Sequence, residues 1–354
     1  AGADTFYGDG GSDTVTYVGA ADDGSHTLYI DLSFGETSGV ASKGSSDAAG
    51  DIFDSSIEKV VGSQTLSNIF YGRNTAEDLT GGNLNDTFYS SAGADRFDGA
   101  GGTQNTADYS NANSPITLTF TNNMITGTSS NPSDWSSGDT LTNIQKIVGT
   151  GLADKLDLTG YSSDMTFVAG NGADIYTGGS GADTIDLKTG RTDSLNGVTV
   201  QGGDGNDTIM VNQAGLSASN FLLSGDSAAS NQTGSNDTLE FYATSVGALD
   251  LKSIFAGGND NKFKYFETLD LSKDGVGSNI TISADWVKAL VDSSGTSTLT
   301  IRLKNSGADA DSYTFSYNQA SGEGLGGGTD LSGKTYTSFT SNGLIVAKVY
   351  IENV

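Results

Sequence analysis

The sequence predicts an all-β protein, built largely as a flattened coil of very short strands. Three observations lead to this prediction. A nine-residue pattern of glycine and aspartate recurs along the chain, glycine is abundant while proline is almost absent (50 and 2 of 354 residues), and stretches of alternating apolar and polar residues separate the repeats. Short repeats of fixed period are typical of coiled, solenoid-like folds, and alternation at every second residue indicates half-buried strands.

The composition excludes several classes of protein. The net charge is −26, with 43 acidic and 17 basic residues, so we expect no nucleic-acid partner, because phosphate binding needs a basic face. There is no cysteine, which excludes disulfides and zinc–thiolate sites. No run of 18 apolar residues predicts a membrane span. The acidic residues indicate either a disordered chain or ligands for a hard cation, and their positions favour the second.

The repeat has the form GGxGxDx, followed by a large apolar residue and one further residue. Its clearest copies are residues 178–186 and 202–210, and a degenerate copy at 72–80 carries Glu77 in place of Asp. Close copies lie at residues 8–16 and 169–177, and looser copies at 81–89 and 90–98. Glycines permit a tight turn, whose carbonyl oxygens and Asp carboxylate are the hard ligands that calcium prefers.

The apolar residue two places after each Asp argues against an acidic linker, which would need no such residue. We expect it to begin a short strand and to point into the coil, with two repeats forming one turn of the coil. The residues at this position are Val15, Phe88, Phe97, Tyr176, Ile185 and Ile209.

These blocks resemble the RTX (haemolysin-type) calcium-binding repeats of proteins exported by type I secretion. The resemblance implies a right-handed parallel β-roll that binds several Ca²⁺ ions between its turns and folds on reaching external calcium. Carried over by position, the carboxylate ligands are Asp4, Asp13, Asp86, Asp95, Asp154, Asp174, Asp183, Asp207 and Asp237. The adjoining loop positions, which would supply further oxygens, are Gly8, Gly10, Gly81, Gly178, Ser180, Gly202 and Asp204.

A longer duplication overlies the short repeat. Residues 26–32 and 116–120 have the alternation of strands, and each stretch is followed by a similar return segment, at 57–62 and 144–149. We therefore expect the β-roll to be interrupted by β excursions. The predicted segments are a first RTX block with an excursion at 1–61, a second at 62–148, a third RTX block at 149–240 and a C-terminal β-rich domain at 241–354.

The C-terminal part predicts strands at 299–303, 313–317 and 343–351, and a short helix at 284–290 that Asp285 could cap. The last six residues resemble a type I secretion tail, although a final core strand is the alternative. Because the chain begins in the middle of a repeat, we expect it to be part of a longer protein.

The sequence favours a binding or structural role over an enzyme. The single histidine, His26, precludes an HExxH motif, and no GxSxG motif is present. We expect a calcium-dependent segment of a secreted bacterial surface adhesin, most like the C-terminal part of a large RTX adhesin. The alternatives are an S-layer protein assembled through calcium and the RTX tail of a secreted enzyme. The expected partners are the type I secretion machinery and a surface glycan, a peptide or a neighbouring subunit.

Overall fold

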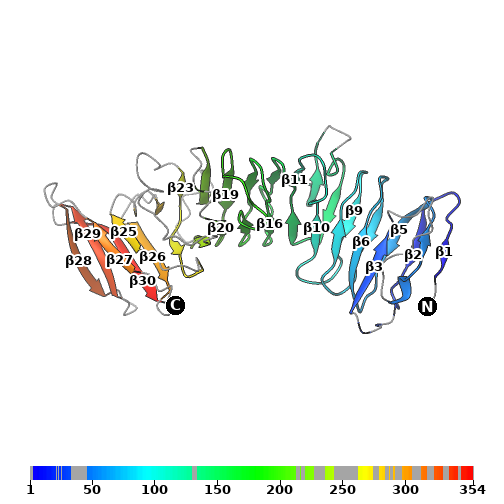
Figure 1. Cartoon of the computed structure of the whole chain (residues 1–354), viewed down its shortest axis with the longest axis horizontal. Coiled ribbons are helices and arrows are strands. Elements are labelled where there is room, and N and C mark those ends of the chain that lie inside the picture. Colours follow the sequence, from blue (N-terminus) through cyan, green and yellow to red (C-terminus); the bar gives the residue numbers. More distant parts are fainter. Residues whose placement is uncertain are drawn as a thin grey trace. The chain divides into compact units, whose positions relative to one another are not determined.

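The computed structural model describes most of the chain. The described residues are 3–20, 22, 24, 26–32, 46–129, 134–212, 216, 220–226, 236–242, 262–273, 279–283, 287, 290–291, 297–304, 312–316, 323–329, 335–341 and 344–353. Strands dominate them, beside a short 3₁₀ helix, η1 (Ser46–Ala48), and helical residues at Val287, Leu290 and Val291. The chain divides into two compact units, residues 1–161 with 165–170 and residues 162–164 with 171–354 (Figure 1).

The first unit is a flattened coil whose strands alternate between two faces. One face holds β2 (Asp13–Thr16), β5 (Ile57–Val61), β7 (Asp78–Thr80), β9 (Arg96–Asp98), β13 (Thr140–Thr142), β12 (Met124–Gly127), β11 (Thr117–Thr121) and β15 (Lys155–Asp157). The other holds β3 (Thr27–Asp31), β6 (Ser67–Tyr71), β8 (Thr87–Tyr89), β10 (Thr106–Asp108), β14 (Lys146–Val148) and β16 (Thr166–Val168). Two short strands, β1 (Thr5–Phe6) and β4 (Ile52–Phe53), pair in parallel at the N-terminal end.

The register of these strands confirms that two nine-residue repeats make one turn of the coil. Phe70 in β6 pairs with Phe88 in β8, and Leu79 in β7 pairs with Phe97 in β9, each an advance of 18 residues. The pairing is parallel, as a coil wound in one direction requires. The predicted parallel β-roll is therefore confirmed.

The two expected excursions lie within the coil. Strand β3, in the first of them, pairs in parallel with β6, and β11, in the second, pairs in parallel with β15. Among the described strands of the first unit, β12 alone runs the other way, antiparallel to both β11 and β13, so the second interruption adds one reversed strand to the sheet. The alternation that predicted the excursions is equally typical of a coil strand, since both bury one face.

The second unit is a coil of the same type. One face holds β17 (Ile175–Thr177), β19 (Thr199–Gly203), β21 (Leu222–Asp226) and β23 (Phe263–Lys264). The other holds β18 (Thr184–Asp186), β20 (Thr208–Asn212), β22 (Thr238–Tyr242), β24 (Thr268–Asp270), β26 (Ser297–Leu303), β30 (Leu344–Asn353), β29 (Thr335–Ser341) and β28 (Glu323–Thr329). The strands β25 (Asn279–Ser283) and β27 (Ser312–Ser316) form a separate parallel pair.

The pairing changes from parallel to antiparallel at the C-terminal end. Strand β26 pairs in parallel with both β24 and β30, whereas β29 is antiparallel to β30 and β28. The three predicted C-terminal strands are confirmed as β26, β27 and β30, while the predicted helix lies almost wholly outside the described residues. The four-segment division of the chain stays a prediction. No helix in the described part is long and apolar enough to cross a membrane.

Columns of apolar side chains fill the space between the two faces. Each column joins equivalent positions of successive turns, as in Phe70, Phe88 and Ala107, or Ile185, Ile209 and Leu239. All the predicted inward residues are at most 7% exposed, from Val15 to Ile209. In the first unit Phe88 stacks on Phe70 of the same face at 5.0 Å, and across the core on Phe97 of the other face at 5.4 Å, between ring centroids.

Candidate metal centre

Each repeat places an acidic residue at the end of its tight turn, immediately before a short strand. The apolar residue two places later is anchored in the core, so the acidic residue is held at a fixed height on the edge of the coil. Asp183, Asp207 and Asp237 illustrate this in the second unit, where the residues two places later (Ile185, Ile209 and Leu239) are fully buried. The turn residues of neighbouring coils are thereby stacked in register.

A ladder of hydrogen bonds connects these carboxylates. In the second unit the amide of Asp183 donates to Asp207 Oδ1 at 2.7 Å, and the amide of Asp207 donates to Asp237 Oδ1, also at 2.7 Å. The amide of Asp237 continues the ladder to Glu267 Oε2 at 2.9 Å. The three aspartates are at most 1% exposed. Consecutive carboxylates are therefore buried beside one another along the edge of the coil.

The first unit contains a second ladder in which a carboxylate and carboxamides take the same positions. The amide of Asn68 donates to Asp86 Oδ1 at 2.6 Å, the amide of Asp86 to Asn105 Oδ1 at 2.8 Å, and the amide of Asn105 to Gln145 Oε1 at 2.9 Å. Carboxamides accept the same hydrogen bond without a charge. This edge is consequently less acidic than the ladder in the second unit.

The opposite edge of the first unit is acidic. The amide of Glu77 donates to Asp95 Oδ1 at 2.9 Å, and the amide of Asp95 donates to Asp139 Oδ1 at 2.8 Å. Asp139 Oδ2 accepts a further hydrogen bond from the hydroxyl of Tyr109 at 2.8 Å. Asp154 caps the same kind of turn, and its Oδ1 accepts the amide of Ile116 at 2.9 Å.

Burial makes these carboxylates hard to ionise without a counter-charge. Burial, together with the charges of Asp139 and Glu77, raises the pKa of Asp95 to about 9. Burial, with the charges of Asp183, Asp237 and Asp226, raises the pKa of Asp207 to about 8.

The same effect extends to other turns of the first unit. Burial raises the pKa of Asp139 to about 7 and that of Asp154 to about 6. It also raises the pKa values of Asp86 and Glu77. Within a protein the charged form of such groups needs a cation nearby.

At several turns the second carboxylate oxygen lies beside a backbone carbonyl oxygen of the next coil. A methyl group placed on Gly202 would collide with both Asp207 Oδ2 and the carbonyl oxygen of Gly225. The same holds at Gly178, where it would collide with Asp183 Oδ2 and the carbonyl oxygen of Gly202. Carboxylate and carbonyl oxygens therefore converge at these glycines, and only a residue without a side chain fits there.

This set of oxygens fits calcium. Calcium takes six to eight hard oxygen ligands in flexible geometry, from carboxylates, carbonyls and water. Among the described residues, Asp207 Oδ2 is buried without a hydrogen-bond partner, and so is Asp13 Oδ2. No cluster of three or more His, Cys, Asp or Glu side chains in the described part could hold a metal alone. Backbone carbonyls would therefore have to complete each site.

The structure places the remaining predicted ligands in several environments. Asp4 is exposed, its amide bonded to Asp51 Oδ1 at 2.9 Å, and the amide of Asp13 donates to Glu58 Oε2 at 2.9 Å. Asp174 is buried and bonded by Arg191. The predicted loop positions are buried at Gly81, Gly178 and Gly202, intermediate at Gly8 and Asp204, and exposed at Gly10 and Ser180. The assignment of all these residues as ligands stays a prediction.

The ladders contain members that sequence reasoning did not assign to sites. They are Asp51, Glu58, Asn68, Asn105, Asp139, Gln145 and Glu267. Most of them stand two places before a buried apolar residue, as Asp139 stands before Leu141. That spacing could have identified them, but none of them ends a complete GGxGxD pattern, and Asn68, Asn105 and Gln145 carry no carboxylate.

A parallel β-roll with laddered acidic turns defines a calcium-binding repeat protein. Comparison with protein families matches the RTX calcium-binding nonapeptide repeat in four copies, at residues 1–17, 71–103, 166–186 and 198–213. The chain therefore carries an RTX calcium-binding repeat region. A search of curated proteins found no match to this chain.

Proposed function

We propose that this chain is a calcium-dependent segment of a surface adhesin exported by type I secretion, and that it folds when it meets extracellular calcium. The observation that carries the proposal is the row of buried carboxylates at Asp183, Asp207 and Asp237, which share hydrogen bonds in one ladder. Ionised carboxylates so close together repel one another, and a cation between the turns would remove that repulsion.

Calcium would then supply folding free energy. A preformed site does not exist in the unfolded chain, so the free energy of ion binding adds to the stability of the fold. The glycine-rich turns lose much backbone entropy on folding, and the ion would offset that loss. About eight divalent ions would reduce the net charge from −26 to about −10.

The difference in calcium concentration between the cytosol and the exterior would make calcium-dependent folding a switch. Calcium sites of extracellular modules have dissociation constants of about 10⁻⁴–10⁻³ M. Such sites would stay unfilled inside a cell and fill outside, so the chain would pass through the secretion machinery unfolded. RTX repeats, which this chain carries, are typical of secreted proteins, and this supports the proposal.

We place the chain among scaffold and binding proteins, not enzymes. Its single histidine, His26, is exposed (81% of the side chain) and paired with Asp22 on the surface. The described acidic residues of the turns are already engaged in the ladders, which supports a structural use for them.

Limited proteolysis would test the folding switch. The chain is incubated with a protease at micromolar and at millimolar free calcium, with millimolar magnesium as a control. We expect protection at millimolar calcium only. Equal protection without calcium would contradict the proposal.

Electron microscopy of the calcium-loaded chain would distinguish an adhesin from an S-layer subunit. We expect isolated particles, which would then be screened against glycans and peptides. Ordered two-dimensional sheets would favour the S-layer subunit instead.

A further inference from the structure

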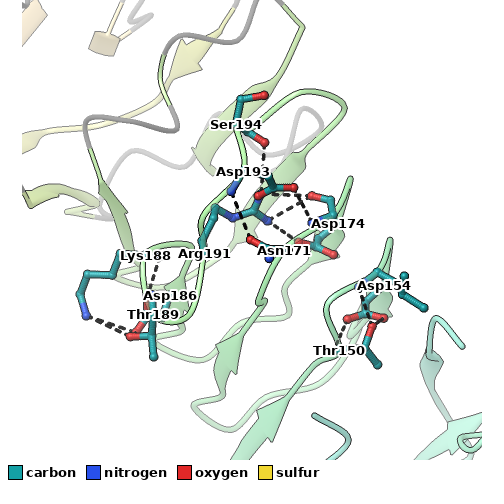
Figure 2. Close-up of polar contacts among 12 residues, drawn as sticks. Thr150, Asp154, Asn171, Asp174, Asp186, Lys188, Thr189, Arg191, Asp193 and Ser194 are labelled. Carbon is teal, nitrogen blue, oxygen red and sulfur yellow. Dashed lines mark hydrogen bonds and ion pairs between the residues drawn. The ribbon is translucent and has the colours of Figure 1, made fainter. Parts of the chain in front are cut away.

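The second unit contains a fully buried cation in one of its turns. The guanidinium of Arg191 is 0% exposed, and its Nη2 lies 2.5 Å from Asp174 Oδ2 (Figure 2). Both terminal nitrogens donate to the carbonyl oxygen of Gly172, at 3.2 and 3.1 Å. Nη1 also donates to the carbonyl oxygen of Ser194 at 3.3 Å and to Asp193 Oδ1 at 2.8 Å. One side chain thus collects two carboxylates and two carbonyl oxygens.

These partners are of the kind that converge around Asp207. There, a carboxylate oxygen of one turn meets the carbonyl oxygen of Gly225 in the next coil. At Asp174, the corresponding oxygens accept hydrogen bonds from the guanidinium of Arg191 instead. A divalent ion placed against Asp174 Oδ2 would stand beside the buried positive charge of Arg191, and such repulsion is strong where water is excluded.

The first unit repeats the arrangement at the degenerate turn. Arg73 Nε lies 3.2 Å from Glu77 Oε1, and the two side chains are 10% and 0% exposed. Its Nη1 donates to the carbonyl oxygen of Asp54 at 3.0 Å, and its Nη2 contacts the carbonyl oxygen of Ile57. A carboxylate and carbonyl oxygens of the neighbouring coil again surround a guanidinium.

The two arginines reach their carboxylates from different places in the sequence. Arg73 stands four residues before Glu77, where the clearest repeats have their second glycine, whereas Arg191 stands 17 residues after Asp174, beyond β18. Arginine keeps its charge at every ordinary pH and forms planar, paired hydrogen bonds to oxygen. It can therefore act as a permanent cation of fixed shape.

We propose that Arg73 and Arg191 take the place of calcium in the Glu77 and Asp174 turns, which are held together by the chain's own cation and bind no ion. The inference rests on the proposed calcium binding at the other turns. Each compact unit would then contain one turn whose order is independent of calcium. Asp174, a calcium ligand by analogy with the repeat, would be an arginine partner in this chain.

Counting bound ions tests the proposal. Native mass spectrometry at saturating calcium gives the number of ions for the wild type, R191G, R191G/D174N and D207N. We expect one additional ion in R191G, because the loss of the guanidinium frees the Asp174 carboxylate and the carbonyl oxygens of Gly172 and Ser194. The double variant should return to the wild-type number, and D207N should lose at least one ion. An unchanged count in R191G, with a circular dichroism spectrum like that of the wild type, would overturn the proposal.

A second measurement needs no variant, in case R191G does not fold. Crystals of the wild-type chain grown with calcium are measured at a wavelength where calcium scatters anomalously. We expect a peak near Asp207 and none within about 2.3–2.6 Å of Asp174 Oδ2. A peak at Asp174 would overturn this inference while leaving calcium binding intact. The absence of any calcium peak would instead contradict the proposed function.

Discussion

The amide of Asp183 donates a 2.7 Å hydrogen bond to Oδ1 of Asp207, which is the equivalent residue of the next coil. The two carboxylates are thereby fixed side by side at the edge of the roll, each 1% exposed. The bond orients one oxygen of Asp207 along the ladder and leaves its second oxygen, Oδ2, facing the glycine turn. The ladder thus aligns carboxylate oxygens that could bind a cation. The same carboxylates, once ionised, need a cation to neutralise their charge.

Replacing Asp207 with Asn should weaken calcium-induced folding. The amide oxygen can still accept the ladder hydrogen bond, as Asn105 does for Asp86, but the charge is lost. We expect the calcium concentration at half-folding to rise about tenfold, because changes close to a metal typically cost 10–100-fold in affinity. A calcium titration followed by circular dichroism measures the midpoint.

The double change of Asp183 and Asp207 to Ala should raise the midpoint further. D157N is a suitable control, since Asp157 ends β15 and accepts only short-range bonds from Thr159. An unchanged midpoint in the double variant would refute the assignment of these two residues.

The loop glycines should differ sharply in their tolerance of alanine. A Cβ at Gly202 would collide with Asp207 Oδ2 and the Gly225 carbonyl, whereas a Cβ at Gly10 meets nothing within 4 Å. We therefore expect G202A to raise the calcium requirement strongly and G10A to leave it nearly unchanged. Equal effects of the two changes would show that the space beside Gly202 is not critical.

Without calcium, the fold should become more stable as the pH falls. The folded-state pKa values of Asp95 and Asp207 are raised to about 9 and about 8, whereas an unfolded Asp titrates near 3.9. The folded state therefore binds more protons, so these groups favour folding at low pH, and their contribution is lost as the pH rises through about 8–9. Far-UV circular dichroism in metal-free buffer, read from pH 9 down to pH 5, should show the β signal rising only as the pH falls.

With calcium, the pH dependence should reverse. Calcium binds the ionised carboxylate, so protons compete with it and the apparent affinity should fall as the pH is lowered. Calcium titrations at pH 5.5 and 8 measure the difference. An affinity that is the same at both pH values would mean that the buried carboxylates do not bind the ion.

Removing the central aromatic ring of the first unit should destabilise the calcium-loaded fold. Phe88 is fully buried between Phe70 and Phe97, and a Phe-to-Ala change in a core costs about 3–5 kcal/mol. Denaturant unfolding of F88A at saturating calcium measures this loss. The control is L84A, at an exposed leucine of the same repeat, which should change stability by less than about 0.5 kcal/mol.

The sequence predicted the roll and its core because the nine-residue repeat carries both kinds of information. The spacing of Asp207 and Ile209 specifies a turn and a buried strand, and the structure contains both. The sequence did not predict that β3 remains in the coil, because a coil strand and an excursion strand have the same alternation.

The side chains that form hydrogen bonds with the acidic turn residues were harder to predict. Arg191 and Asp174 stand 17 residues apart, with β17 and β18 between them, so only the folded chain shows that they meet. Asn105 and Gln145 were missed as ladder members because they carry a carboxamide where the repeat has a carboxylate.

Far-UV circular dichroism against free calcium, with magnesium as the control ion, tests the central claim most directly. The account predicts a cooperative gain of β signal with calcium and none with magnesium. A spectrum that is already rich in β structure in chelator, and that calcium does not change, would contradict it. The laddered aspartates would then be parts of the turns alone, with no role as calcium ligands.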